Sequence, residues 1–169
     1  MENKIHNNLN IENLIKTKAF NKLTAEQKKE LLTSSQWIKQ FNYYQQEEIL
    51  TGIKNNVDIS IYVNKEYDWI QMSELREGLE ANLDVSIYKN PDFHWSQMQE
   101  IRLGLEKNLD ISLYAKKDFN MPQMEQIRLG LEDNLDISKY ANPEIDYEEM
   151  KKIRLKLQEK KRNGKQNIQ

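Results

Sequence analysis

A thirteen-residue phrase recurs in this 169-residue chain: Glu100–Ser112 reads EIRLGLEKNLDIS, and Gln126–Ser138, twenty-six residues later, reads QIRLGLEDNLDIS. Four residue types keep the same spacing: Met72, Met98, Met124 and Met150; Gly52, Gly78, Gly104 and Gly130; Asp58, Asp84, Asp110 and Asp136; Tyr62, Tyr88, Tyr114 and Tyr140. A fixed period of this length is typical of stacked repeat proteins, whose units bury their apolar faces against one another.

Each repeat predicts one long helix and one short helix. In the unit from Asp84 to Asn108, the spacing of Met98, Ile101 and Leu105 puts their side chains on one helix face. A capping residue followed three positions later by Gln or Glu indicates where each long helix begins; the pairs are Asp68 with Gln71, His94 with Gln97, Asn120 with Gln123, and Asp146 with Glu149.

Asparagine, which tolerates the left-handed conformation, indicates where each long helix ends; these residues are Asn56, Asn82, Asn108 and Asn134. Aspartate then suits the N-cap of a short helix; these residues are Asp58, Asp84, Asp110 and Asp136. We expect long helices of about thirteen residues and short ones of about five. No alternation predicts a strand. The predicted fold is all-α: a short α-solenoid of 26-residue repeats with a divergent N-terminal cap.

The predicted organisation has three parts: a helical cap over 1–43, an acidic repeat array over 44–158 and a basic flexible tail over 159–169. In the cap, Ile11, Leu14 and Ile15 predict one helix, Thr24 begins another with a capping box, and Ser35 opens a short helix. Terminal repeats of a solenoid diverge because one of their faces meets water.

The phased glycines need a repeated compensation, because glycine inside a helix costs about 1 kcal/mol relative to alanine. On a helical wheel, Gly104 and Leu103 lie on opposite sides of the apolar stripe. We therefore expect a leucine of one helix to cover the glycine of the preceding helix. The expected pairs are Leu103 on Gly78, Leu129 on Gly104, and Leu155 on Gly130.

Composition excludes several classes of function. The chain has no cysteine, which rules out disulfides, thiolate catalysis and cysteine-ligated zinc. The first fourteen residues, MENKIHNNLNIENL, do not resemble a signal peptide or a membrane span, so we expect a cytoplasmic protein without membrane contact. Residues 44–150 carry a net charge of −12 and residues 151–169 carry +7. This partition is the charge feature that bears most on partners.

No residue set predicts catalysis. The motif Asp-x-Ser-x-Tyr occurs four times in phase, whereas an active site is needed once, and no histidine or lysine shares its phase as a base. His6 lies in the N-terminal segment, and His94 occupies a capping position. We expect no cofactor and no metal. A metal-assisted enzyme built around His94 and Asp92 remains a rival hypothesis, which elemental analysis would test.

The repeated phrase QMxEIRLGLExNLDISxYAxP resembles helical repeats of about 26 residues in proteins of prophages and mobile elements from low-GC Gram-positive bacteria. The resemblance covers residues 44–158. It departs from the usual GLD at Asn82, Asn108 and Asn134, an exchange that keeps the cap chemistry. The family has no catalytic motif to carry over. A small acidic protein of this kind is similar to anti-CRISPR inhibitors.

The leading hypothesis is a monomeric, non-enzymatic inhibitor or adaptor whose acidic face occupies the basic groove of a nucleic-acid-handling protein, such as a CRISPR nuclease. The predicted contact residues are acids with two tryptophan anchors: Glu74, Glu77, Glu80, Asp133, Glu144, Asp146, Trp69 and Trp95. The alternative is a nucleic-acid-binding regulator that uses the basic end, although the acidic body opposes direct binding; its residues would be Lys151, Lys152, Arg154, Lys160, Lys161 and Arg162. The phased arginines either tie repeats together or grip a partner; they are Arg76, Arg102, Arg128 and Arg154.

Overall fold

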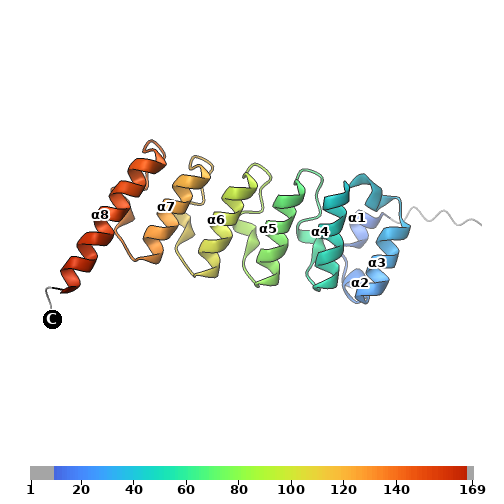
Figure 1. Cartoon of the computed structure of the whole chain (residues 1–169). Coiled ribbons are helices and arrows are strands. Elements are labelled where there is room, and N and C mark those ends of the chain that lie inside the picture. The colour runs from blue at the N-terminus through green and yellow to red at the C-terminus, as the bar shows by residue number, and fades with distance from the viewer. Residues whose placement is uncertain (1–9, 167–169) are drawn as a thin grey trace, which may run out of the picture. The chain divides into compact units, whose positions relative to one another are not determined.

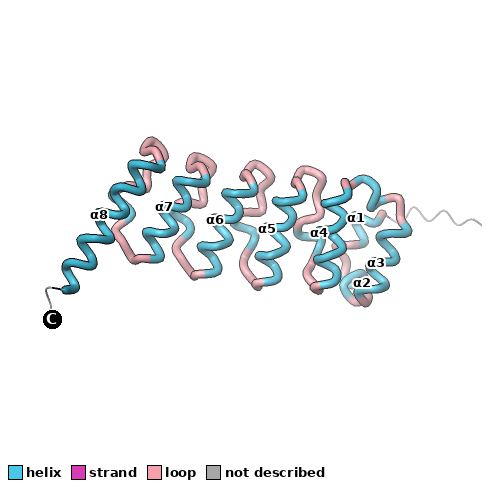
Figure 2. Tube along the Cα trace, in the orientation of Figure 1, coloured by secondary structure: helices cyan, strands magenta, loops and turns pink. Residues whose placement is uncertain are grey.

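Long helices alternate with single 3₁₀ turns through most of the chain (Figures 1 and 2). A computed structural model describes residues 10–166, with side chains up to Gly164, and these residues form helices and no strand. The all-α prediction is therefore confirmed for this part of the chain. The first elements are α1 (Ile11–Leu14), α2 (Lys18–Asn21), α3 (Ala25–Ser34) and the 3₁₀ helix η1 (Trp37–Gln40). The repeated long helices are α4 (Tyr43–Lys54), α5 (Trp69–Glu80), α6 (Trp95–Glu106), α7 (Met121–Glu132) and α8 (Tyr147–Gln166). The 3₁₀ helices between them are η2 (Ile59–Ile61), η3 (Val85–Ile87), η4 (Ile111–Leu113) and η5 (Ile137–Lys139).

The predicted capping boxes begin α5, α6 and α7, and at α8 the Glu149 N–H donates to the side chain of Asp146 at 2.9 Å. In α7, the side chain of Asn120 accepts from the Gln123 N–H at 3.1 Å, and the Gln123 side chain accepts from the Asn120 N–H at 2.9 Å. The same glutamine donates its amide to the Ile145 carbonyl at 2.7 Å. Gln45 and Gln97 make the equivalent bonds to the Tyr67 and Phe119 carbonyls, so these glutamines satisfy their own helix start and also hold the loop that follows.

The predicted asparagines end the long helices in the left-handed conformation, with φ between 49° and 58°. In the third full repeat, the Leu109 N–H donates to the Gly104 carbonyl at 2.9 Å, and the Asn108 N–H donates to the Leu105 carbonyl at 2.9 Å. This pair of bonds is the Schellman motif that the sequence predicted. The long helices α4 to α7 have 12 residues, and the short helices between them are 3₁₀ turns of 3 residues, shorter than expected.

The predicted leucine covers over the glycines are wrong. A Cβ on Gly104 would lie 1.9 Å from the Tyr114 hydroxyl and 2.8 Å from Ile111, both in the short helix of the same repeat. Tyr114 is fully buried, and its hydroxyl donates to the Glu100 carbonyl at 3.0 Å. Leu155, expected to cover Gly130, is 45% exposed. The glycine leaves room for the tyrosine ring that folds back from ten residues later.

The other glycines meet the same partner. An added Cβ would lie within 2.0 Å of a tyrosine hydroxyl in every repeat; the pairs are Gly52 with Tyr62, Gly78 with Tyr88, Gly104 with Tyr114, and Gly130 with Tyr140. The four tyrosines are fully buried and form the centre of each repeat's core, with the phased methionines and isoleucines around them.

The N-terminal region departs in part from its prediction. Ile11 and Ile15 are buried as expected, but two short helices replace one, because Thr17 ends the first and caps the second through the Phe20 N–H at 3.1 Å. Thr24 begins α3 with the predicted capping box. Ser35 does not cap η1; its hydroxyl donates to the Leu32 carbonyl at 2.7 Å. His6 lies outside the described residues.

The chain divides between Arg76 and Glu77 into two compact units. The first unit contains α1 to α4 and the beginning of α5, so the predicted boundary after residue 43 lies inside it. In the second unit, α6 packs against α7 and α7 against α8 (Figure 1). Residues 159–166, which belong to the predicted basic flexible tail, continue helix α8 to Gln166. No helix among residues 10–166 is long and apolar enough to cross a bilayer.

Candidate functional site

The phased arginines tie successive repeats together. In the first unit, the Nε of Arg76 donates to the carboxylate of Glu48 at 2.8 Å. In the second unit, Arg128 makes the equivalent bond to Glu100 at 2.7 Å, with both residues two repeats after Arg76 and Glu48. Arg128 also pairs with Glu132, four residues ahead on the same helix. These partners lie mostly inside the fold, so the arginines act first as structural links.

Arg102 shows the same arrangement with different acids. Its two terminal nitrogens pair with Glu77 at 2.9 Å and with Glu106 at 2.6 Å. Lys107 adds a second link, to Glu132 at 2.6 Å. Four carboxylates of the second unit are therefore held in internal ion pairs: Glu77, Glu100, Glu106 and Glu132.

Burial and pairing shift the pKa values of several groups in and beside these ion pairs. Burial raises the pKa of Glu100, and the hydrogen bond and charge of Arg128 offset only part of that effect. For Glu132, burial also acts to raise the pKa, but hydrogen bonds from Lys107 and Arg128 outweigh it, so the pKa lies below its ordinary value. Burial raises the pKa of Tyr140 to about 12, so its hydroxyl stays protonated and continues to donate.

The predicted acidic contact residues differ in exposure and in their internal partners. Glu74 is buried, so it is not available to a partner in this fold. Glu77 is partly exposed and paired with Arg102, and Glu80 is exposed. In the second unit, Asp133 accepts a bond from the Gln158 amide at 2.7 Å, and both Glu144 and Asp146 are exposed.

An exposed aromatic cluster lies in the first unit, where α4 and α5 begin. Tyr43, Tyr44 and Trp69 are 69%, 57% and 40% exposed. The rings of Tyr44 and Trp69 have centroids 5.4 Å apart, as do those of Tyr43 and Tyr44. We call these three residues the aromatic cluster. It combines a predicted anchor, Trp69, with two tyrosines that the sequence interpretation missed.

The sequence held a signal for one of these tyrosines, because Tyr43 precedes Trp69 by one repeat and Trp69 precedes Trp95 by another. All three stand at the first position of a long helix. Trp95 is only partly exposed, and its ring lies 5.2 Å from that of His94.

Three exposed carboxylates lie close in sequence to the aromatic cluster. Glu47 lies one turn after Tyr43 on α4, and Glu66 and Asp68 precede Trp69; all three are exposed. One oxygen of Asp68 caps α5 by accepting from the Ile70 N–H at 2.8 Å and the Gln71 N–H at 2.9 Å. The neighbourhood is therefore apolar at its centre and mainly acidic around it.

His94 acts as a helix cap. Its Nδ1 lies 2.7 Å from the Ser96 hydroxyl, and its backbone N–H donates to Gln97 at 2.9 Å. Within residues 10–166, no group of three or more histidines and carboxylates is arranged to hold a metal ion.

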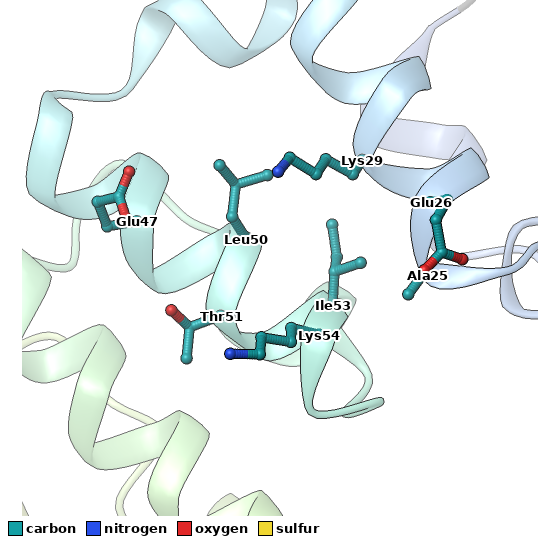
Figure 3. A pocket seen from close by; sticks show the side chains of 8 residues that line it. All are labelled: Ala25, Glu26, Lys29, Glu47, Leu50, Thr51, Ile53 and Lys54. Carbon is teal, nitrogen blue, oxygen red and sulfur yellow. The ribbon is translucent and has the colours of Figure 1, made fainter.

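A groove of about 540 Å³ lies between α3 and α4 in the first unit (Figure 3). Leu50 and Ile53 form its apolar part, and Figure 3 shows Lys29 reaching across from α3 toward Leu50. Two carboxylates and two ammonium groups line it, from Glu26, Glu47, Lys29 and Lys54. The balanced charge gives it no preference for an ionic ligand.

No protein-family model, curated protein or solved structure matches this chain.

Proposed function

We propose that the protein is a non-enzymatic binding module that attaches through the aromatic cluster to a basic protein surface. The observation that carries this proposal is the exposure of Tyr43, Tyr44 and Trp69 as one contiguous group. Monomeric proteins rarely expose large aromatic groups together without an interaction to use them. Tyrosine and tryptophan are also the residues that most often dominate binding energy at protein interfaces.

The carboxylates around the cluster support a basic partner. Glu47, Glu66 and Asp68 would form a charged rim, and charges at a rim steer association and select against acidic proteins. Lys65 is the exposed positive charge among them, so the rim remains net negative. The partner chemistry is therefore a cationic surface with an apolar recess.

A more specific form of the proposal is an inhibitor that acts in the cytoplasm, as a monomer, by occupying the nucleic-acid groove of its target. Grooves of that kind are basic, and regularly placed carboxylates can replace phosphates in them. The resemblance of the 26-residue repeats to those of prophages and mobile elements makes a CRISPR effector nuclease the first target to test. We further propose that the repeats stack as a short α-solenoid, which the packing of α6 on α7 and of α7 on α8 supports.

The test is binding of the full chain to a purified RNA-guided nuclease, measured by biolayer interferometry over a range of salt concentrations. We expect Trp69→Ala to weaken binding by a factor of about 30, the effect of a hot-spot aromatic worth about 2 kcal/mol. Glu47→Gln should mainly slow association and flatten the salt dependence. Leu113→Ala is the matched control, because Leu113 is an exposed apolar residue outside the cluster. Binding that ignores both salt and Trp69→Ala would refute the proposal.

The competing hypothesis, a nucleic-acid-binding regulator, is favoured by one observation: α8 continues to Gln166 and carries exposed cations along its length. Truncation after Leu157 removes the cations of residues 160–165. Loss of oligonucleotide binding in that truncated chain, with the nuclease test negative, would favour this function instead.

A further inference from the structure

Arg154 differs from the other phased arginines in its counter-charges. Arg76 pairs with Glu48, and Arg128 pairs with Glu100 and Glu132. Arg154, in α8, donates its Nε to the side-chain oxygen of Gln126 at 3.0 Å, and within residues 10–166 it pairs with no carboxylate. A neutral amide therefore stands where the equivalent arginine meets a negative charge.

Both acids around Arg128 are replaced by amides around Arg154. Glu100 corresponds to Gln126 and Glu132 corresponds to Gln158, each one repeat later. Gln158 donates its amide to Asp133 at 2.7 Å. One repeat earlier, the residues at the same two positions are Glu132 and Lys107, which form an ion pair at 2.6 Å. A glutamate at 158 would repel Asp133, which accounts for the amide there. The amide nitrogen of Gln126 donates to the carboxylate of Glu125 at 3.3 Å, and its oxygen is left for Arg154.

The burial of Arg154 makes this difference significant. Arg154 and Arg128 are both 8% exposed. A guanidinium stays charged in proteins, and a buried charge without a counter-charge is strongly disfavoured. The two terminal nitrogens of Arg154 have no acceptor in the described part of the chain. They keep some solvent-accessible surface, because the buried side-chain nitrogen without a partner in that part of the chain is Trp37 Nε1. They can therefore reach an acceptor that arrives from outside.

Two lysines share the stripe of α8 that carries Arg154, and the nearby acids Asp133 and Glu125 are bonded to Gln158 and Gln126. Gln158 and Lys161 follow it at four and seven positions, and Lys151 precedes it by three, so these residues share its stripe of α8. Lys151 is exposed, and Lys161 donates to the Asp133 carbonyl at 2.6 Å and the Asn134 carbonyl at 3.1 Å. An incoming anion would meet favourable potential on this stripe.

We propose that Arg154, between Gln126 and Gln158, is a binding site for a carboxylate that a protein partner supplies. A carboxylate is favoured over other anions because the equivalent arginine of the preceding repeat holds two of them in the same position relative to its helix. The planar fork of a guanidinium also matches both oxygens of a carboxylate. The site lies in the second unit and does not depend on the aromatic cluster, so it goes beyond the function proposed above.

The test uses the full chain and a blocked hexaglutamate peptide, with a hexathymidine oligonucleotide of comparable charge as the competing probe. Binding is followed by the NMR resonance of the Arg154 Nε–H and by fluorescence anisotropy of the labelled probes at low salt. Gln126→Glu restores the internal carboxylate seen beside Arg128 and should weaken peptide binding about tenfold or more, with a smaller shift of the Arg154 resonance. Lys156→Gln is the control, because it changes the net charge by the same amount at an exposed position of α8.

Three results would overturn the proposal. The first is a peptide that does not shift the Arg154 resonance. The second is equal weakening by Gln126→Glu and Lys156→Gln, which would reduce the effect to net charge. The third is an oligonucleotide that binds more tightly than the peptide and is lost in Gln126→Glu, which would make the ligand a nucleic-acid phosphate. Because the readout is local to α8, none of these results bears on Trp69 or on the aromatic cluster.

Discussion

Replacing Gly104 by alanine should destabilise the protein, although the same change stabilises most helices. The new methyl would lie 1.9 Å from the Tyr114 hydroxyl and 2.8 Å from Ile111. The tyrosine is fully buried and bonded to the Glu100 carbonyl, so it must move and lose that bond or force the backbone apart.

The magnitude of this effect follows from three contributions. Overpacking in a core costs about 1–3 kcal/mol. A buried hydroxyl left without its partner costs about 1–3 kcal/mol. The better helix propensity of alanine offsets about 1 kcal/mol. Gly104→Ala should therefore lower the free energy of unfolding by about 1–5 kcal/mol.

Urea denaturation followed by far-ultraviolet circular dichroism measures this loss, and two further variants identify its cause. Gly164→Ala is the matched control, because a Cβ there meets nothing within 4 Å, and it should be neutral or slightly stabilising. Adding Tyr114→Phe removes the atom nearest the methyl, so the double variant should lose less than the sum of the single variants. Equal stability of Gly104→Ala and the parent, or additive losses in the double variant, would refute the reasoning.

Three other predictions concern the same repeat and its neighbour. Asn108→Ala should cost about 1–2 kcal/mol in urea denaturation, whereas Asn108→Gly should not, because the residue has a φ of 54°. Gln123→Ala should cost about 1–3 kcal/mol and speed amide exchange at Asn120, since it removes both the bond that the Asn120 N–H donates and the bond to the Ile145 carbonyl. Hydrogen bonds from Lys107 and Arg128 lower the pKa of Glu132 by more than burial raises it, so its pKa in the folded protein lies below the ordinary value of 4.5. The ionised Glu132 therefore stabilises the fold above pH 4.5, and this stabilisation is lost as the pH falls through the folded pKa. The Tm difference between the parent and Glu132→Gln should accordingly be largest near neutral pH and should shrink as the pH falls below 4.5. A Tm difference that does not change with pH would contradict this.

The helix limits could be predicted from the sequence because they depend on chemistry within a few residues. The box of Asn120 with Gln123 and the left-handed Asn108 are each fixed by backbone groups of their own turn. The break at Thr17 was missed because a threonine can cap a new helix only where the chain turns, and the turn depends on how Ile15 and Phe20 are buried.

The partner of each glycine could not be found from phase alone. The repeated glycines, leucines and tyrosines all recur with the same period of 26 residues. Spacing therefore favours neither the leucines nor the tyrosines as the partners of the glycines. The first repeat does distinguish the two possibilities. If each glycine met the residue at the leucine position, Gly52 would meet Glu77, whereas the residue at the tyrosine position is Tyr62. The far end agrees, because Lys156 replaces the glycine where Gln166 replaces the tyrosine.

The exposure of individual acids could not be predicted for a different reason. A sequence gives the number of carboxylates but not which of them the fold uses internally. Glu74 and Glu100 are buried, and Glu132 lies between Arg128 and Lys107. Burial of a charged side chain depends on a partner in another helix, which no local pattern of the sequence identifies.

The two groups of carboxylates that result should respond differently to neutralisation. Glu100 belongs to the ladder, so Glu100→Gln should lower the Tm because Arg128 loses a buried partner, while leaving exposed surface unchanged. Glu47 is exposed beside the aromatic cluster, so Glu47→Gln should leave the Tm nearly unchanged and alter only association with a basic partner. Thermal melts and binding kinetics on the same two variants separate these effects. A Tm that falls for Glu47→Gln as far as for Glu100→Gln would mean that the exposed acids are structural too, and the binding role of that surface would then lose its basis.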